Sequence, residues 1–191
     1  MYRYYIRKVV IGISEKPRFI LGIDPSLSGT GYCILDCKNK KKYPKLVETG
    51  VVRGRNKTWR DETTQVKLSL IQSKIKEIIS KYRPLYKDIF IERGFTRFNN
   101  DTQAIFKARG AIEAELVEYN IVEISPREVK KIITGRGDAS KEEVKTTLAQ
   151  MLGVDESVFI TDDASDATAV ALSGYLLYIR PYEEDREVSN H

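Results

Sequence analysis

A hydrophobic run that ends on a carboxylate, then a tight turn and a second hydrophobic run, is the feature that most constrains this chain. The first run is Phe19–Ile23, and Asp24 follows it directly. A turn rich in serine and glycine leads into the second run, Tyr32–Leu35. This pattern predicts a β-hairpin with Asp24 at the tip of a buried strand. A buried carboxylate is costly unless it is paired or ligates a metal, so Asp24 is either a site residue or only the opener of the turn.

Three more carboxylates stand out for the same reason. Glu92 ends a second short hydrophobic strand. Asp163 and Asp166 lie three residues apart near the start of an apolar helix, so they share one face of it. Carboxylates in a first helical turn also suit the helix dipole, so capping by Asp162 or Asp163 is the alternative; it explains Asp166 less well.

The remaining segments fit a single domain, predicted over residues 19–181. Strands are expected at residues 18–24, 31–36, 45–52, 87–92 and 120–124, and helices at 61–82, 102–119, 127–133, 140–152 and 162–181. Ser140 and Glu143 form a capping-box pattern at the start of the fourth helix, and Gly153 caps its end. Residues 1–18 are expected to form an N-terminal arm or an extra strand, and residues 182–191 an acidic, flexible tail.

The charge of the chain favours a polyanionic partner, nucleic acid first. The net charge is +5 and the isoelectric point is about 9.1. Two basic clusters fit such a partner. Lys38–Lys42 is either a DNA contact or a solvated turn, and Arg53–Arg60 with Trp59 is either a nucleic-acid surface or an exposed loop.

The positions of the cysteines and of the histidine exclude several kinds of catalytic and metal site. Cys33 and Cys37 lack a zinc-site spacing and fit a reduced, cytoplasmic compartment, with Cys33 in the core. The single histidine is His191, which excludes internal Ser-His-Asp and Cys-His arrangements. The sequence holds no apolar run long enough to span a membrane. Acid–base or metal chemistry must therefore rest on Asp, Glu, Lys or Tyr side chains.

The four carboxylates form a candidate metal site whose ligands are all oxygens. Such ligands suit hard cations, Mg²⁺ or Mn²⁺. Converging carboxylates can hold two such ions about 3.5–4 Å apart, the geometry used for phosphodiester hydrolysis. Lysines near the site could offset the charge that builds on the phosphate, and Lys130 and Lys141 are the candidates. Together with the positive net charge, this favours a DNA or RNA substrate.

Six short segments, in one order, carry a resemblance to a known family. They are Leu21–Pro25 with Gly29–Tyr32, Ile89–Glu92, Ala108–Gly110, Ser125–Lys130, Thr134–Gly137 with Lys141, and Asp163–Ala167. Each is weak alone, but together they are specific, and the chain resembles the RuvC-type Holliday junction resolvases of the RNase H-like superfamily. The resemblance implies an α/β fold of the RNase H-like type, with a central mixed five-stranded sheet flanked by helices.

The resemblance also implies a function and a set of residues. The implied protein is a homodimer that makes symmetric paired nicks in four-way DNA junctions, with helix 102–119 near the dimer contact. The family's acidic metal ligands, expected to hold two ions, fall on Asp24, Glu92, Asp163 and Asp166, and its functional lysines fall on Lys130 and Lys141. An aromatic residue that opens or stacks on junction bases falls on Phe95. The other expected DNA contacts are Arg97, Arg109, Lys131 and Arg136.

Departures from the family pattern indicate a divergent member, such as one carried by a phage or another mobile element. Ser26 replaces the usual glycine, and Arg93–Gly94 follows Glu92 where other residues are usual. The N-terminal arm and the Lys38–Lys42 loop are also longer than is typical.

Two other functions compete with the nuclease. One is an actin/hexokinase-like phosphate-binding domain, in which Gly29–Gly31 would cradle a phosphate. The chain is short for two such lobes and lacks a convincing second phosphate loop. The other is a DNA-structure-binding protein without catalysis, which would leave the carboxylates and their partners Lys130 and Lys141 without a role.

Overall fold

The chain folds around one mixed sheet of five strands, as predicted. The computed structural model describes residues 18–38, 42–53, 62–85, 87–94 and 99–181, so the predicted terminal arm and tail lie outside the described residues. The strands are β1 (Phe19–Asp24), β2 (Thr30–Asp36), β3 (Lys45–Val52), β4 (Ile89–Glu92) and β5 (Ile121–Ile124). The helices are α1 (Thr64–Tyr82), α2 (Asn99–Glu115), α3 (Pro126–Thr134), α4 (Lys141–Leu152) and α5 (Asp162–Gly174).

The order of the strands places the two carboxylate-bearing strands next to each other. The sheet runs β3-β2-β1-β4-β5, with β1, β2 and β3 antiparallel and with β4 and β5 parallel to β1. Helix α1 connects β3 to β4, and this crossover carries β4 past β2 to the free side of β1. The carboxyl ends of β1, β4 and β5 therefore meet at one edge of the sheet.

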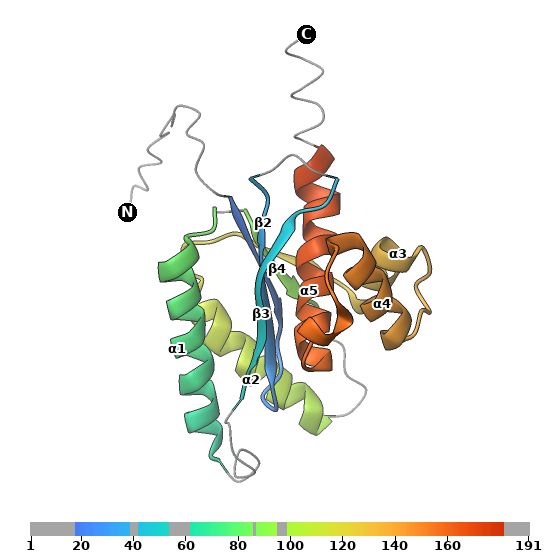
Figure 1. Ribbon diagram of the computed structural model, residues 1–191. Coiled ribbons are helices and arrows are strands. Elements are labelled where there is room, and N and C mark those ends of the chain that lie inside the picture. The colour runs from blue at the N-terminus through green and yellow to red at the C-terminus, as the bar shows by residue number, and fades with distance from the viewer. Residues whose placement is uncertain (1–17, 39–41, 54–61, 86, 95–98, 182–191) are drawn as a thin grey trace, which may run out of the picture.

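Helices cover both faces of the sheet (Figure 1). Helices α1 and α2 lie on one face, and α3, α4 and α5 lie on the other. Successive side chains of β1 alternate between two cores: Leu21 and Ile23 face α1 and α2, whereas Ile20 faces α5. Cys33 is fully buried in the second of these cores, which confirms its prediction as a core residue. None of the helices described is long and apolar enough to cross a membrane.

One predicted helix boundary is wrong by several residues. The helix expected over 102–119 is α2, which spans Asn99–Glu115. The Leu116 N–H and the Tyr119 N–H each donate to a carbonyl three residues back, and these tight turns end the helix and lead into β5. Val117, which was expected on the helix, is 83% exposed. Its side chain therefore buries little apolar surface that could stabilise a longer helix.

Helix α5 continues to residue 181 through a π-helical turn, Tyr175–Ile179. The turn follows Gly174, where an added Cβ would lie 2.3 Å from the ring of Phe90. A side chain at this position would force the helix off the sheet. The predicted extent of the last helix is confirmed.

Candidate active site

Asp24 and Glu92 lie side by side at the ends of parallel strands β1 and β4. The register pairs Ile23 with Ile91, so the next residue of each strand falls at the same edge of the sheet. The turn after β1 is closed by Thr30, whose hydroxyl donates to a backbone carbonyl within the turn at 2.7 Å. The Asp24 carboxyl faces Glu92 instead, with which it shares a hydrogen bond. The turn therefore does not account for Asp24.

Helix α5 reaches this edge because glycines let it approach the sheet closely. A Cβ on Gly31 would lie 1.9 Å from the Asp163 carbonyl oxygen, and one on Gly22 would lie 2.5 Å from the Ala167 carbonyl oxygen. Neither position accepts a larger residue unless the helix moves. This close packing places the first turns of α5, with Asp163 and Asp166, over the β1–β2 hairpin.

Thr161 is the residue that caps α5. Its side-chain oxygen accepts from the Ala164 N–H at 3.2 Å, so the cap predicted as an alternative for Asp162 or Asp163 is supplied elsewhere. The Asp163 carboxyl is directed at the hairpin, where its Oδ2 lies 3.1 Å from the position a Cβ on Gly29 would take. Asp163 is therefore available for the site.

Burial and repulsion from neighbouring carboxylates raise the pKa values of Asp24, Glu92 and Asp163. The pKa of Asp24 is raised well above 3.8 by burial, then by the charge of Glu92, and further by Asp166 and Asp163. Burial also raises the pKa of Glu92, against the effect of the hydrogen bond it shares with Asp24. Burial and the charge of Asp166 raise the pKa of Asp163. The four side chains interact, and together they favour a positive charge among them.

Two lysines on capped helices oppose this negative charge. The Lys141 Nζ lies 2.7 Å from the Asp166 Oδ2. Burial would lower the pKa of Lys141, but the hydrogen bond to Asp166 and the nearby carboxylates raise it. Lys130, on α3, and Lys141 each lower the pKa of Glu92. The structure thus brings both predicted lysines to the predicted carboxylates.

Lys141 owes its place to the start of α4, where the predicted capping box is confirmed. The Ser140 side chain accepts from the Glu143 N–H at 3.2 Å, and the Glu143 carboxylate accepts from the Ser140 N–H at 2.7 Å. Gly153 ends the helix in the left-handed conformation, also as predicted.

The donor chemistry of the site fits a hard divalent cation. All four candidate ligands are carboxylates, and each would be relieved of repulsion by a cation. Among the residues the structure describes, no three Asp, Glu, Cys or His side chains are grouped closely enough to hold one ion. Asp24 is instead bonded to Glu92, and Asp166 to Lys141. A bound cation would replace the proton in the first pair and the ammonium group in the second.

Arg109, a predicted DNA contact, is engaged within the protein. It donates to Glu113 at 2.6 Å and also pairs with Glu123, which lies 3.2 Å from Arg93. Only 13% of the Arg109 side chain is exposed. In this conformation Arg109 ties α2 to β5, and a contact with DNA would require it to leave these partners.

The other predicted DNA contacts differ in how they are placed. Lys131 and Arg136 are exposed on α3 and on the loop that follows it. Phe95 and Arg97 lie outside the described residues. Arg53 also lies near the site, although nothing in the sequence connects it to the carboxylates, and its charge lowers the pKa of Asp163. No local pattern could reveal that proximity, because it arises where the end of β3 passes α5.

Comparison with known proteins fits this arrangement. Residues 20–174 match the family described as crossover junction endodeoxyribonuclease RuvC. The chain belongs to the RuvC family. The RuvC proteins of Prochlorococcus marinus (strain MIT 9211) and Brachyspira hyodysenteriae are 32% and 35% identical to it. These matches cover 82% and 80% of this chain and 94% and 91% of those proteins.

Solved structures of RuvC proteins share the fold. Thermus thermophilus RuvC in complex with a Holliday junction substrate is similar with a TM-score of 0.73 and 25% identity, over 86% of this chain and 96% of that one. The yeast mitochondrial Holliday junction resolvase has the same fold, with a TM-score of 0.58 at 16% identity, over 88% of this chain and 84% of that one. The predicted RNase H-like fold and the predicted nuclease class are confirmed, and the family does not support the two competing functions.

Proposed function

We propose that this protein is a Holliday junction resolvase, a metal-dependent endonuclease that cuts four-way DNA junctions. The observation that carries the proposal is the convergence of four carboxylates at one sheet edge, with Lys141 bound to one of them at 2.7 Å. An all-oxygen site opposed by lysines suits phosphodiester hydrolysis assisted by hard cations. The junction-bound structure of Thermus thermophilus RuvC and the net charge of +5 support a branched DNA substrate.

The residues of the site divide into ligands and phosphate-facing cations. Mg²⁺ or Mn²⁺, two ions per site, would be held by Asp24, Glu92, Asp163 and Asp166. When bound, these cations would activate the attacking water and stabilise the leaving oxygen. Lys130 and Lys141 supply positive charge where negative charge builds on the phosphate. Burial and the charge of Glu92 raise the pKa of Asp24, and because a ligand carboxyl must be deprotonated, cation binding there would be favoured by higher pH.

The assembly and the remaining DNA contacts belong to the same proposal. We infer a homodimer, because paired nicks on opposite strands need two active sites, and we place α2 near the dimer contact. DNA contacts are proposed for Phe95, Arg97, Arg109, Lys130, Lys131, Arg136 and Lys141. A cytoplasmic location stays a prediction that rests on the two cysteines, Cys33 and Cys37, which are not joined in a disulfide bond.

The test is cleavage of a synthetic four-way junction with Mg²⁺, beside a linear duplex of the same sequence. Paired nicks at symmetric positions of the junction alone are expected. Nicking of both substrates would keep the carboxylate mechanism but overturn junction selectivity. Tight binding with no cleavage, with either Mg²⁺ or Mn²⁺, would overturn the enzymatic role.

A matched pair of variants on α5 tests the ligand assignment. Asp166→Asn is expected to abolish cleavage while junction binding persists. Asp162→Asn removes the same charge one turn earlier on α5. The Asp162 side chain is 73% exposed and lies 3.9 Å from Lys141, farther than Asp166 at 2.7 Å, so this variant is expected to retain most of the activity. Equal loss in both variants would contradict the specific role of Asp166.

A further inference from the structure

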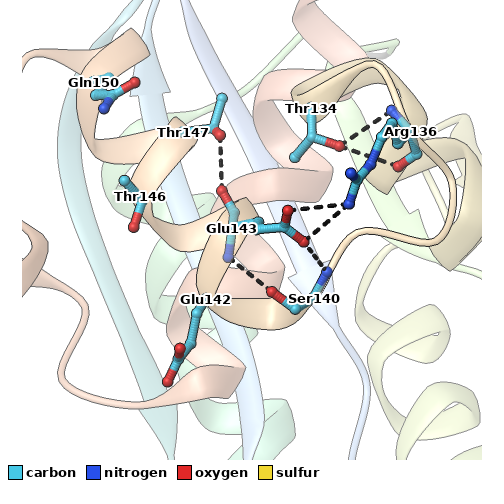
Figure 2. Close-up of a pocket in the computed structure, with 8 residues that line it drawn as sticks. All are labelled: Thr134, Arg136, Ser140, Glu142, Glu143, Thr146, Thr147 and Gln150. Atoms are coloured by element: carbon cyan, nitrogen blue, oxygen red, sulfur yellow. Dashed lines mark hydrogen bonds and ion pairs between the residues drawn. The ribbon is translucent and has the colours of Figure 1, made fainter.

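A polar pocket between α3 and α4 holds one of the predicted DNA-contacting arginines in an ion pair (Figure 2). The pocket has a volume of about 500 Å³, and Thr134, Arg136, Ser140 and Glu143 are among its lining residues. The Arg136 Nη2 lies 3.0 Å and 3.3 Å from the two carboxylate oxygens of Glu143. A second carboxylate, that of Asp138, lies 3.5 Å from the Arg136 Nε. The positive charge of Arg136 is thus largely met by the protein itself.

The backbone of Arg136 is fixed. Gly135 ends α3 in the left-handed conformation, with a φ of 81°, and its N–H donates to the Lys131 carbonyl. The Arg136 N–H donates to the Thr134 hydroxyl oxygen at 3.2 Å, and that hydroxyl donates to the Lys130 carbonyl at 2.8 Å. The side chain, 62% exposed, extends from this anchored loop. The exposed Arg136 guanidinium is therefore carried by a loop whose backbone is tied to the last turn of α3, the helix that also carries Lys130.

Glu143 binds two partners at once. One is the Ser140 N–H, at 2.7 Å, in the capping box that begins α4, and the other is the Arg136 guanidinium. Ser140 immediately precedes Lys141, which reaches Asp166. The carboxylate that pairs with Arg136 therefore also helps to fix the helix end that carries a lysine of the active site.

We propose that Glu143 sets the affinity of this loop for DNA: its carboxylate holds Arg136 in the free protein, and a backbone phosphate of bound DNA replaces it there. The inference rests on the proposed function. A guanidinium N–H donates to carboxylate and phosphate oxygens alike, so Glu143, which faces the Arg136 Nη2, occupies a donor that a phosphate would use. Both side chains are more than half exposed, and ion pairs of this kind are weak enough for a phosphate to displace.

The substitution that isolates this role is Glu143→Gln. Glutamine retains the capping box, because its side-chain oxygen can still accept from the Ser140 N–H. It removes the closer of the two carboxylates that pair with Arg136 and leaves Asp138 in place. Glu128→Gln is the matched control, because Glu128 closes the same capping box on α3 and has no ion pair to a described residue. Glu142→Gln controls for general loss of negative charge, since Glu142 lines the same pocket and is likewise unpaired within the described part of the chain.

The measurement is binding of a four-way junction by fluorescence anisotropy, without divalent metal. Glu143→Gln is expected to tighten binding about two- to fivefold, whereas the two control variants bind like the wild type. Arg136→Gln is expected to weaken binding and to reduce the dependence of log K on log salt by about one. The double variant is expected to bind like Arg136→Gln alone, because the proposed effect of Glu143 on DNA affinity depends on its ion pair with Arg136.

Three results would overturn the proposal. They are unchanged binding in Glu143→Gln, equal tightening in Glu142→Gln, and additive effects in the double variant. Thermal unfolding of each variant shows whether the capping box survived. If Glu143→Gln lowers Tm, Arg136→Lys is the second variant. Lysine keeps the positive charge but lacks the guanidinium group, so this variant is expected to bind the junction more weakly than the wild type. Cleavage of the junction by the wild type separates this proposal from the proposed function: if the wild type cuts junctions, only the role of Glu143 is in question.

Discussion

Gly31 and Asp163 are in direct contact across two elements: a Cβ built on Gly31 would lie 1.9 Å from the Asp163 carbonyl oxygen. The contact joins the β1–β2 hairpin, which carries Asp24, to the helix that carries Asp166. The spacing of the site therefore depends on the absence of a side chain at one position of β2.

Gly31→Ala is expected to push α5 away from the sheet and to impair both folding and cleavage. The loss of stability should be about 1–3 kcal/mol, the usual cost of overpacking a core. Urea unfolding measures it. Gly110→Ala is the control, because a Cβ on Gly110 meets nothing within 4 Å, and alanine should raise helix stability by about 0.5–1 kcal/mol. A Gly31→Ala protein with wild-type stability would contradict the close seating of α5.

Asp24→Asn is expected to abolish cleavage and yet stabilise the fold. Burial, reinforced by Glu92, raises the pKa of Asp24 above 3.8, so the folded protein binds more protons than the unfolded chain between these two pKa values. Stability therefore falls as the pH rises through this range, and the charged carboxylate is unfavourable at neutral pH. Removing it should raise Tm by about 2–4 °C, which corresponds to 1 kcal/mol in a domain of this size.

The gain of Asp24→Asn depends on pH in a way that identifies its cause. Near neutral pH the gain should be present, and it should vanish at acidic pH, where Asp24 is protonated in both states. Calorimetry at several pH values measures it, with Glu62→Gln, at an exposed position, as the control. A destabilised Asp24→Asn protein that still cleaves DNA would argue for a structural role of this residue.

Lys141→Gln is expected to lower kcat by about 10²–10³-fold, the effect of removing one preorganised charge from a developing oxyanion. The substitution removes the ammonium group 2.7 Å from Asp166 and leaves an uncharged polar side chain that is one bond shorter. Single-turnover cleavage with saturating enzyme separates this effect from binding. Lys145→Gln, one turn further along α4, is the control and should cleave at nearly the wild-type rate. Similar rates in both variants would remove Lys141 from the active site.

Glu48→Gln is expected to destabilise the fold from the opposite side of the sheet. Glu48, on β3, accepts hydrogen bonds from Tyr82 at 2.5 Å, Lys81 at 2.9 Å and Tyr32 at 3.0 Å. These bonds hold α1 on the sheet. Loss of the charge should cost about 1.5–3 kcal/mol, the usual contribution of hydrogen bonds to a charged group.

The contribution of Glu48 should be lost in acid. Burial alone would raise the pKa of Glu48, but the hydrogen bonds lower this pKa from 4.5 to about 2. The unfolded chain therefore takes up the proton first, so the stabilisation is complete above pH 4.5 and disappears as the pH falls towards 2. Urea unfolding at a series of pH values should show the wild type and Glu48→Gln converging in acid. Glu77→Gln, which removes only a pair with Lys74 on the surface of α1, should cost less than about 0.5 kcal/mol.

Much of the candidate site was predictable because its signals are local. Asp24 and Glu92 each end a hydrophobic run, and a carboxylate in that position is costly wherever the strand is buried. The capping box of Ser140 and Glu143 spans only four residues, so its hydrogen bonds depend little on the rest of the fold. The extent of α2 was missed because helical periodicity continues past Glu115 while the turns that stop the helix leave no strong signal.

By itself, the sequence determined which residues could serve the site: the strand ends, the capped helices, the charges and the family pattern. Only the tertiary structure decided which of them meet. The pairing of Arg136 with Glu143, the partners of Arg109 and the seat of α5 on Gly31 all join segments whose contact depends on strand order and helix packing. Periodicity and capping reflect interactions within a few residues, whereas these contacts arise only when distant segments are packed together, and no local pattern records that.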